Sequence, residues 1–306
     1  MSTTSFCAFL AGVSYLFISL AQGQTIPVSI PMMNIAGKKI VSVSINGSGP
    51  YNFLLDTGSN ITLVDRGLLR ELKLSGIEPV TLVTVLGETS QQAGMSAKSI
   101  GIGGLNLEHV ALATFDRAQM VRFDKRVQGI LGENFLAHFD LLIDNDGETL
   151  TLDAGSSLAA SLAGERLPIS RFGIANSAST EDRLIVKVKV PSYLQKPLLF
   201  LVDSGANAAV LYPGQEGAAV RAMQGSQRAD LMGLDQRQTC RIRKATVELG
   251  AEKFRGIDLA ACEGLTRYKM DTDGVIPTSI FHRLFISYKG GYMIANPQPV
   301  NIVAAR

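Results

Sequence analysis

The sequence predicts an all-β fold of two pseudo-symmetric lobes with a few short helices. The chain has 306 residues, more than one hydrophobic core usually organises. Short β-rich runs separated by turn signals fill it, with little helical periodicity. In addition, FLLDTGSN at 53–60 returns as FLVDSGAN at 200–207, almost half a chain length later. This return indicates an internal duplication in which each half brings one aspartate, Asp56 or Asp203, to a shared site.

Composition places the chain among folded proteins. Hydrophobic residues make up 46% of it and charged residues 18%, which excludes a mainly disordered chain. The formal net charge is only +2, so we expect no basic surface of the kind that binds phosphate backbones. Nucleic acid is therefore not an expected partner.

The N-terminus has the pattern of an export signal. An uncharged apolar run at 6–21 precedes polar residues, and the small residues Ser19 and Ala21 suit cleavage before Gln22. We therefore expect a signal peptide at 1–21 and a periplasmic or secreted mature protein without a membrane span. No Lys or Arg precedes the run, so an uncleaved anchor is the alternative. Residues 22–39 are either a propeptide or a first strand.

The first lobe is expected at 22–155. It starts with two strands joined by an Asn-Gly turn at 46–47, and apolar residues at helical spacing predict a short helix at 64–74. Two β-prone arms at 81–97 surround a turn at 87–89, and another hairpin is centred on the glycines at 103–104. An Asn-Asp-Gly turn at 145–147 joins the last two strands. The fragment around this turn resembles part of a calcium loop but lacks the downstream glutamate, so we interpret it as a turn.

The second half repeats this order after a connection at 156–182 that is rich in small and polar residues. This leaves 183–306 as the second lobe. Within it, Cys240 and Cys262 are equally distant from a turn candidate at 250–252. An antiparallel hairpin about this turn would place the two cysteines opposite each other, either as a disulfide or as two separate buried thiols.

The two aspartates have a chemical reason to meet. A carboxylate at the end of an apolar strand is costly to bury alone, whereas two that approach across a pseudo-twofold axis can share one proton and hold one water molecule. One carboxyl then serves as the acid and the other as the base, and the water is the nucleophile. Asp56 and Asp203 are therefore the predicted catalytic residues, and this chemistry needs neither a metal nor another cofactor.

The residues after each aspartate support the same site. Thr57 and Ser204 carry hydroxyl groups that can tie one loop to the backbone of the other. Gly58 and Gly205 allow a sharp turn that presents backbone N–H groups to the carboxylates.

At these residues the chain resembles the pepsin and retropepsin superfamily (clan AA) of aspartic peptidases, and it is most similar to exported bacterial retropepsin-like members with two fused lobes. The two Asp-Thr/Ser-Gly triplets match that family's active-site triplets, and GILG at 129–132 matches its apolar-apolar-glycine segment. The resemblance implies two acid-protease-like closed β-barrel lobes with the active site between them. It also implies a flap at 81–97, with Leu86, Gly87, Glu88 and Thr89 at its tip, and a cleft that binds extended peptides.

Two departures from the family pattern stand out. Pro277 occupies the position of the expected glycine in the second lobe, which leaves open how the chain passes under that loop, and the flap candidate has no tyrosine. The favoured function is an aspartic-type endopeptidase acting on peptides or proteins as a monomer, since a duplicated chain needs no second copy. The alternatives are a non-catalytic peptide-binding module on the same fold and, less supported, a glycosidase with more widely separated carboxyls.

Overall fold

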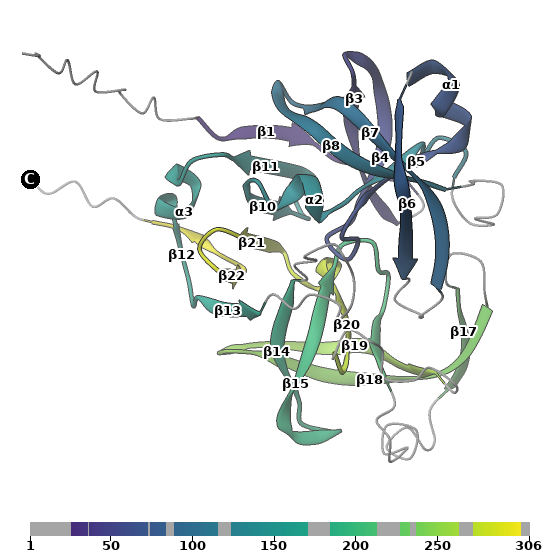
Figure 1. The fold of residues 1–306 in the computed structure, drawn as a ribbon. Coiled ribbons are helices and arrows are strands. Elements are labelled where there is room, and N and C mark those ends of the chain that lie inside the picture. The colour runs from purple at the N-terminus through teal and green to yellow at the C-terminus, as the bar shows by residue number, and fades with distance from the viewer. Residues whose placement is uncertain are drawn as a thin grey trace, which may run out of the picture.

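The computed structural model describes residues 26–300 except 36, 73, 84–88, 116–123, 171–183, 213–226, 233–236 and 263–271. The predicted signal peptide lies outside these residues. Strands dominate the described chain, and they form two barrels beside a sheet that joins them (Figure 1). This architecture confirms the predicted all-β fold of two pseudo-symmetric closed lobes.

The first barrel closes with six strands in the order β3–β4–β9–β5–β8–β7, because β7 pairs with β3 as well as with β8. Strands β2 and β6 extend this sheet to eight strands. The strands are β2 (Met33–Ile35), β3 (Lys38–Ile45), β4 (Ser48–Leu55), β5 (Thr62–Asp65), β6 (Ser75–Val83), β7 (Thr89–Ile102), β8 (Leu105–Phe115) and β9 (Gly129–Leu131).

The second barrel repeats this connectivity. Its order is β14–β15–β20–β16–β19–β18, closed by a pairing of β18 with β14, and β17 lies beside β18 as β6 lies beside β7. The strands are β14 (Ile185–Val190), β15 (Leu194–Asp203), β16 (Ala209–Leu211), β17 (Gln227–Met232), β18 (Arg237–Leu249), β19 (Glu252–Cys262) and β20 (Gly274–Pro277).

Corresponding apolar residues fill one face of each barrel. In the first barrel a cluster contains Ile40, Leu54, Leu63 and Ile130, and in the second barrel the residues at the matching strand positions are Ile185, Leu201, Val210 and Val275. The internal duplication predicted from the sequence therefore extends to the packing of the two cores.

A third group of strands, which we call the bridging sheet, joins the two halves. Its order is β1–β11–β10–β21–β22–β13, and β10 pairs with β21 from Asp140↔Ser287 to Asp144↔Arg283. The strands are β1 (Val28–Pro31), β10 (Asp140–Asp144), β11 (Thr149–Asp153), β13 (Leu167–Ser170), β21 (Arg283–Ser287) and β22 (Tyr292–Ala295), and a separate pair is β12 (Leu162–Ala163) with β23 (Gln298–Pro299).

Two segments whose structure the sequence left open take part in sheets. Of the two alternatives for residues 22–39, the structure has strands, since β1 pairs with β11 and β2 pairs with β3. The predicted connection at 156–182 includes α3, β12 and β13, so it takes part in sheets as far as the structure describes it. The predicted domain boundaries stay a prediction.

Helices are short, as predicted. They are η1 (Arg66–Leu68), α1 (Leu69–Leu72), α2 (Glu133–Leu136), α3 (Ser157–Ser161) and η3 (Thr278–Ile280). The helix predicted at 64–74 corresponds to η1 and α1, whereas its first two residues still belong to β5. No helix among the described residues combines the length and apolar character that crossing a bilayer requires.

The hairpin turns predicted from Asn-Gly and glycine pairs are present in the structure. Asn46 and Gly47 both have positive φ, at 52° and 77°, and they join Ile45 to its partner Ser48. Such a pair of left-handed residues matches the twist of a tight hairpin. The glycines at 103–104 likewise join β7 to β8, and Gly250 begins the turn between β18 and β19.

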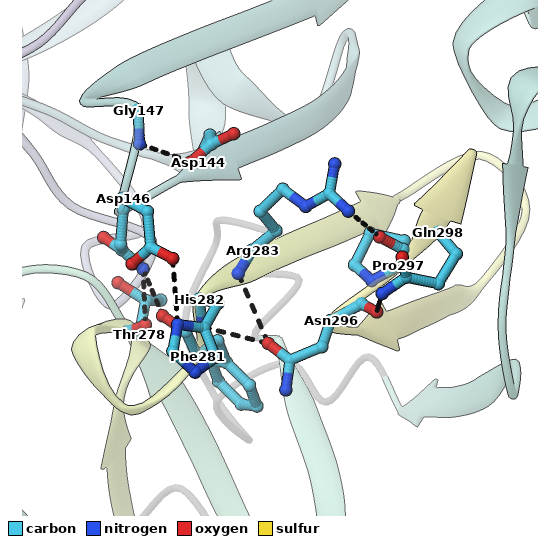
Figure 2. A network of polar contacts seen from close by, with 11 residues as sticks. Asp144, Asp146, Gly147, Thr278, Phe281, His282, Arg283, Asn296, Pro297 and Gln298 are labelled. Atoms are coloured by element: carbon cyan, nitrogen blue, oxygen red, sulfur yellow. Dashed lines mark hydrogen bonds and ion pairs between the residues drawn. The ribbon is translucent and has the colours of Figure 1, made fainter.

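The Asn-Asp-Gly turn between β10 and β11 contacts the second half of the chain (Figure 2). Asp144 Oδ1 accepts from Gly147 N at 2.6 Å, which closes the turn. Asn145 Nδ2 donates to the carbonyls of Thr278 at 2.9 Å and Phe281 at 3.0 Å. The segment is therefore a structural turn, as interpreted from the sequence, and it fastens the first half to the start of β21.

Candidate active site

Both predicted catalytic aspartates lie at the end of a buried strand in equivalent surroundings. Strand β4 runs parallel to β9 and leads to Asp56, whose N–H donates to Leu131 O at 3.1 Å. Strand β15 runs parallel to β20 and ends at Asp203. Both strands are enclosed in their barrels, which is why the residues just before each aspartate are apolar. Their strand pairing holds the start of the loop that follows each of them.

The hydroxyl groups of Thr57 and Ser204 tie the two loops together reciprocally. Thr57 Oγ1 donates to Val202 O at 2.9 Å and accepts from Ser204 N at 3.1 Å. Ser204 Oγ donates to Leu55 O at 2.7 Å and accepts from Thr57 N at 3.0 Å. These four buried bonds use each hydroxyl as both donor and acceptor, so the two loops are held in a fixed relation across the lobe interface.

The glycines bring each loop against the opposite carboxyl group. A Cβ atom on Gly58 would lie 2.5 Å from Asp203 Cγ, and one on Gly205 would lie 2.7 Å from Asp56 Cγ. Each glycine N–H also donates to the aspartate of its own loop, Gly58 to Asp56 at 2.9 Å and Gly205 to Asp203 at 2.6 Å. Glycine is required at both positions because any side chain would overlap the opposite carboxyl.

The structure brings the two carboxyl groups of Asp56 and Asp203 into direct contact. The two side chains lie within hydrogen-bond reach of each other, so a proton on one carboxyl can be shared with the other. Burial raises the pKa of Asp56 well above its ordinary value, and the neighbouring charge and hydrogen bond of Asp203 raise it further. Such a pair can hold one proton between two groups over a range of mildly acidic pH.

Lys38 is a charged residue of this site that sequence reasoning missed. It lies at the start of β3, and its Nζ donates to Gly205 O in the opposite loop. Burial lowers the pKa of Lys38, while the charges of Asp203 and Asp56 oppose this shift. The hairpin register contained a signal for it. Ile40 pairs with Leu54, and the same register continued by two residues brings Lys38 level with Asp56.

With Pro277 in place of glycine, the strand under the Asp203 loop still pairs as its counterpart in the first lobe does. Asp203 pairs with Pro277 in the same parallel arrangement that joins Leu55 to Leu131. In the first lobe Gly132 N donates to Thr62 Oγ1 at 3.1 Å. The matching position of Thr62 is Ala209, which is buried and has no hydroxyl. Proline lacks the N–H and alanine lacks the acceptor, so the second lobe has no counterpart of this hydrogen bond and leaves neither partner unsatisfied.

The tip of the flap predicted at 81–97 lies mostly outside the described residues. Leu86, Gly87 and Glu88 are among these undescribed positions, and Thr89 begins β7. The arms on either side do pair, from Ser75↔Ser96 to Val83↔Thr89, so a hairpin exists at this place. Its role as a flap stays a prediction.

Cys240 and Cys262 are Cα partners across β18 and β19, and Cys240 is disulfide-bonded. The sequence predicted this opposition from a three-residue turn. The structure instead has a tight turn, with Leu249 opposite Glu252, and a bulge between Ala245 and Val247 that shifts the register by one residue. The bulge is what brings the two cysteines level.

The expected absence of a metal site stays a prediction. Among the residues that the structure describes, no three side chains of His, Cys, Asp or Glu gather in a way that could hold an ion. His282, one of the three histidines, is exposed and contacts Asp146 on the turn shown in Figure 2.

Comparison with known proteins bears on the first lobe. A search of the curated proteins finds no match to the chain. Residues 41–135 match the family model described as aspartyl protease, and this range runs from β3 through the Asp56 loop and β9 to α2. The match supports a protease-like function with peptide substrates. Over this range the chain is similar to that family, which supports a clan AA, retropepsin-like aspartic peptidase family for it.

Proposed function

We propose that the protein is an aspartic-type endopeptidase in which Asp56 and Asp203 act together. The observation that carries this proposal is the direct contact of the two carboxyl groups, held by loops that the Thr57 and Ser204 hydroxyls join reciprocally. A rigid pair of carboxyls that shares one proton is suited to acid-base catalysis on a polarised carbonyl. A glycosidase needs carboxyls about 5 Å or more apart, so the hydrogen-bonded pair disfavours that alternative.

The reaction follows from the protonation state of the pair. The ionised carboxyl removes a proton from a water molecule held between the two groups, and the water oxygen attacks the carbonyl carbon of the peptide bond. The protonated carboxyl gives its proton to the carbonyl oxygen. In the collapse of the resulting tetrahedral intermediate, the carboxyl that took the proton of the water gives it to the leaving amine, and the other carboxylate takes the proton of a hydroxyl group of the intermediate as the carbonyl re-forms. The pair again holds one proton, and no covalent enzyme intermediate is formed.

The substrate is an extended peptide segment that lies across the two aspartates beneath the β6–β7 hairpin. Strand-like backbone offers hydrogen-bond donors and acceptors along its length, which suits a cleft built from β-structure. We further propose that the mature protein is exported after cleavage near Gln22, as the apolar N-terminal run indicates, and that it acts as a monomer.

The test is incubation of the mature protein with a peptide library from about pH 3 to about pH 7, read by mass spectrometry. Asp56→Asn and Asp203→Asn should each abolish cleavage, because neither variant can form a carboxyl pair that shares a proton. Asp258→Asn is the matched control, since this exposed aspartate pairs with Lys244 on the surface.

The outcomes separate the peptidase from the peptide-binding alternative. Cleavage by the control protein that is lost in both dyad variants supports the proposal. Peptide retention without cleavage at any pH would identify a non-catalytic binding module. Cleavage that survives both dyad substitutions would rule out the dyad as the catalyst.

A further inference from the structure

The β2–β3 hairpin brings one cation from the first lobe to the loop of Asp203 in the second. Gly37 turns this hairpin with a φ of +79°, and its N–H donates to Asn34 Oδ1 at 2.9 Å. Residues two apart on a strand face the same side, so Lys38 shares the face of the buried Ile40, whereas Lys39 faces the other side. The hairpin geometry therefore selects Lys38, and not its neighbour, for the active site.

Lys38 makes its contact across the lobe interface. Its Nζ donates to the carbonyl oxygen of Gly205, the residue that packs against the Asp56 carboxyl. Within its own lobe the same loop is closed by the Asp203 carboxyl, whose Oδ1 accepts from Gly205 N at 2.6 Å and from Ala206 N at 3.0 Å. The ammonium group therefore adds another bond from the first lobe to the Asp203 loop, beside the four made by the hydroxyls, and this bond is strong because the donor is charged.

Three charged or titratable groups face one another here. They are Lys38 at the start of β3, Asp56 after β4 and Asp203 at the end of β15, and no other charged side chain of the described residues contributes to the electrostatics of Lys38 or Asp56. The positive charge of Lys38 lowers the pKa of Asp56 against the stronger effects that raise it. A partly buried cation near a carboxyl pair stabilises the ionised form of the pair.

We propose that Lys38 is a positioning residue that holds the Asp203 loop and sets the pH range over which the Asp56–Asp203 pair carries one negative charge. This inference rests on the proposed peptidase function for its kinetic consequence. Its electrostatic part depends only on the three groups and can be measured without any substrate.

The direction of the effect follows from charge. Without the ammonium group the pair holds its protons more tightly, so a higher pH is needed to reach the form with one negative charge. Both limbs of the pH profile of kcat/KM should then move to higher pH, with about a tenfold loss on the acidic limb. Loss of the bond to Gly205 should also lower kcat at the optimum, because the loop is held less firmly.

The experiment compares Lys38→Met, Lys38→Arg and Lys39→Met. Lys38→Met should shift the pH profile, Lys38→Arg should restore it at least in part because the charge is kept, and Lys39→Met should leave it unchanged. If Lys38 had only a structural role, its replacement would lower kcat equally at all pH values, and the pH profiles of Lys38→Met and Lys38→Arg would have the same midpoints. An unshifted profile in Lys38→Met would overturn the inference.

A second measurement keeps the test independent of activity. Titration of the aspartate carboxyl carbons by NMR, with Asp56→Asn and Asp203→Asn used for assignment, follows the pair directly in each lysine variant. Upward movement of the titration in Lys38→Met, in a protein that cleaves no peptide, would support the role of Lys38 while refuting the peptidase. Peptide cleavage together with an unchanged carboxyl titration in Lys38→Met would support the peptidase and refute the role of Lys38. If Lys38→Met does not fold, Lys38→Gln replaces it in both measurements.

Discussion

Replacement of Thr57 by valine tests whether the bonds between the two loops stabilise the fold. Thr57 is fully buried, and its hydroxyl donates to Val202 O and accepts from Ser204 N. Valine has nearly the same shape, so the change removes both bonds without opening a cavity. It leaves a carbonyl and an N–H group buried without their partner.

The expected cost follows from these two groups. A buried donor or acceptor that loses its partner costs about 1–3 kcal/mol, so the free energy of unfolding should fall by roughly 2–4 kcal/mol. The matched control is Thr114→Val in β8. Thr114 is also fully buried, but its hydroxyl oxygen has no hydrogen-bond partner among the described residues. Valine at this position should leave stability unchanged or raise it by up to about 1 kcal/mol.

The assay is urea unfolding of both variants beside the unsubstituted protein, with coincident spectroscopic probes to check two-state behaviour. A lower midpoint with an unchanged m-value in Thr57→Val alone is the expected result. If Thr57→Val and Thr114→Val change the midpoint equally, the hydroxyl bonds between the loops contribute nothing measurable, and the reasoning about the lobe interface is wrong.

Three further predictions concern the site and the disulfide. Gly205→Ala should reduce cleavage about a hundredfold, because the new Cβ would lie 2.7 Å from Asp56 Cγ, whereas Gly76→Ala, with nothing within 4 Å, should not. Asp56→Asn should raise the free energy of unfolding, measured in urea, at neutral pH but not at pH 3. Burial raises the pKa of Asp56, so folding favours its protonated form, and the stability that this form contributes is lost as pH rises through the folded pKa. Alkylation of the unreduced mature protein should label neither Cys240 nor Cys262, which are Cα partners with Cys240 disulfide-bonded; labelling of either one would contradict the pairing.

Local sequence was enough to predict the hairpins and the duplication. Asn46 and Gly47 accept left-handed backbone at little cost, so they favour a tight β3–β4 turn from local sequence alone. The repeated triplets at Asp56 and Asp203 predicted the two loops because the same short-range pattern of apolar strand and glycine turn recurs in each half. The opposition of Cys240 and Cys262 was predicted correctly but for an incomplete reason, since a bulge in β18 completes it.

The sequence by itself thus determined the residues of the dyad and the strands that carry them, because those features depend on neighbours within a few positions along the chain. Only the tertiary structure decided how the halves join: the pairing of β10 with β21, the four bonds of Thr57 and Ser204, and the position of Lys38 beside the opposite loop. Each of these contacts joins residues more than a hundred positions apart, and their geometry depends on how two complete barrels pack rather than on any local preference.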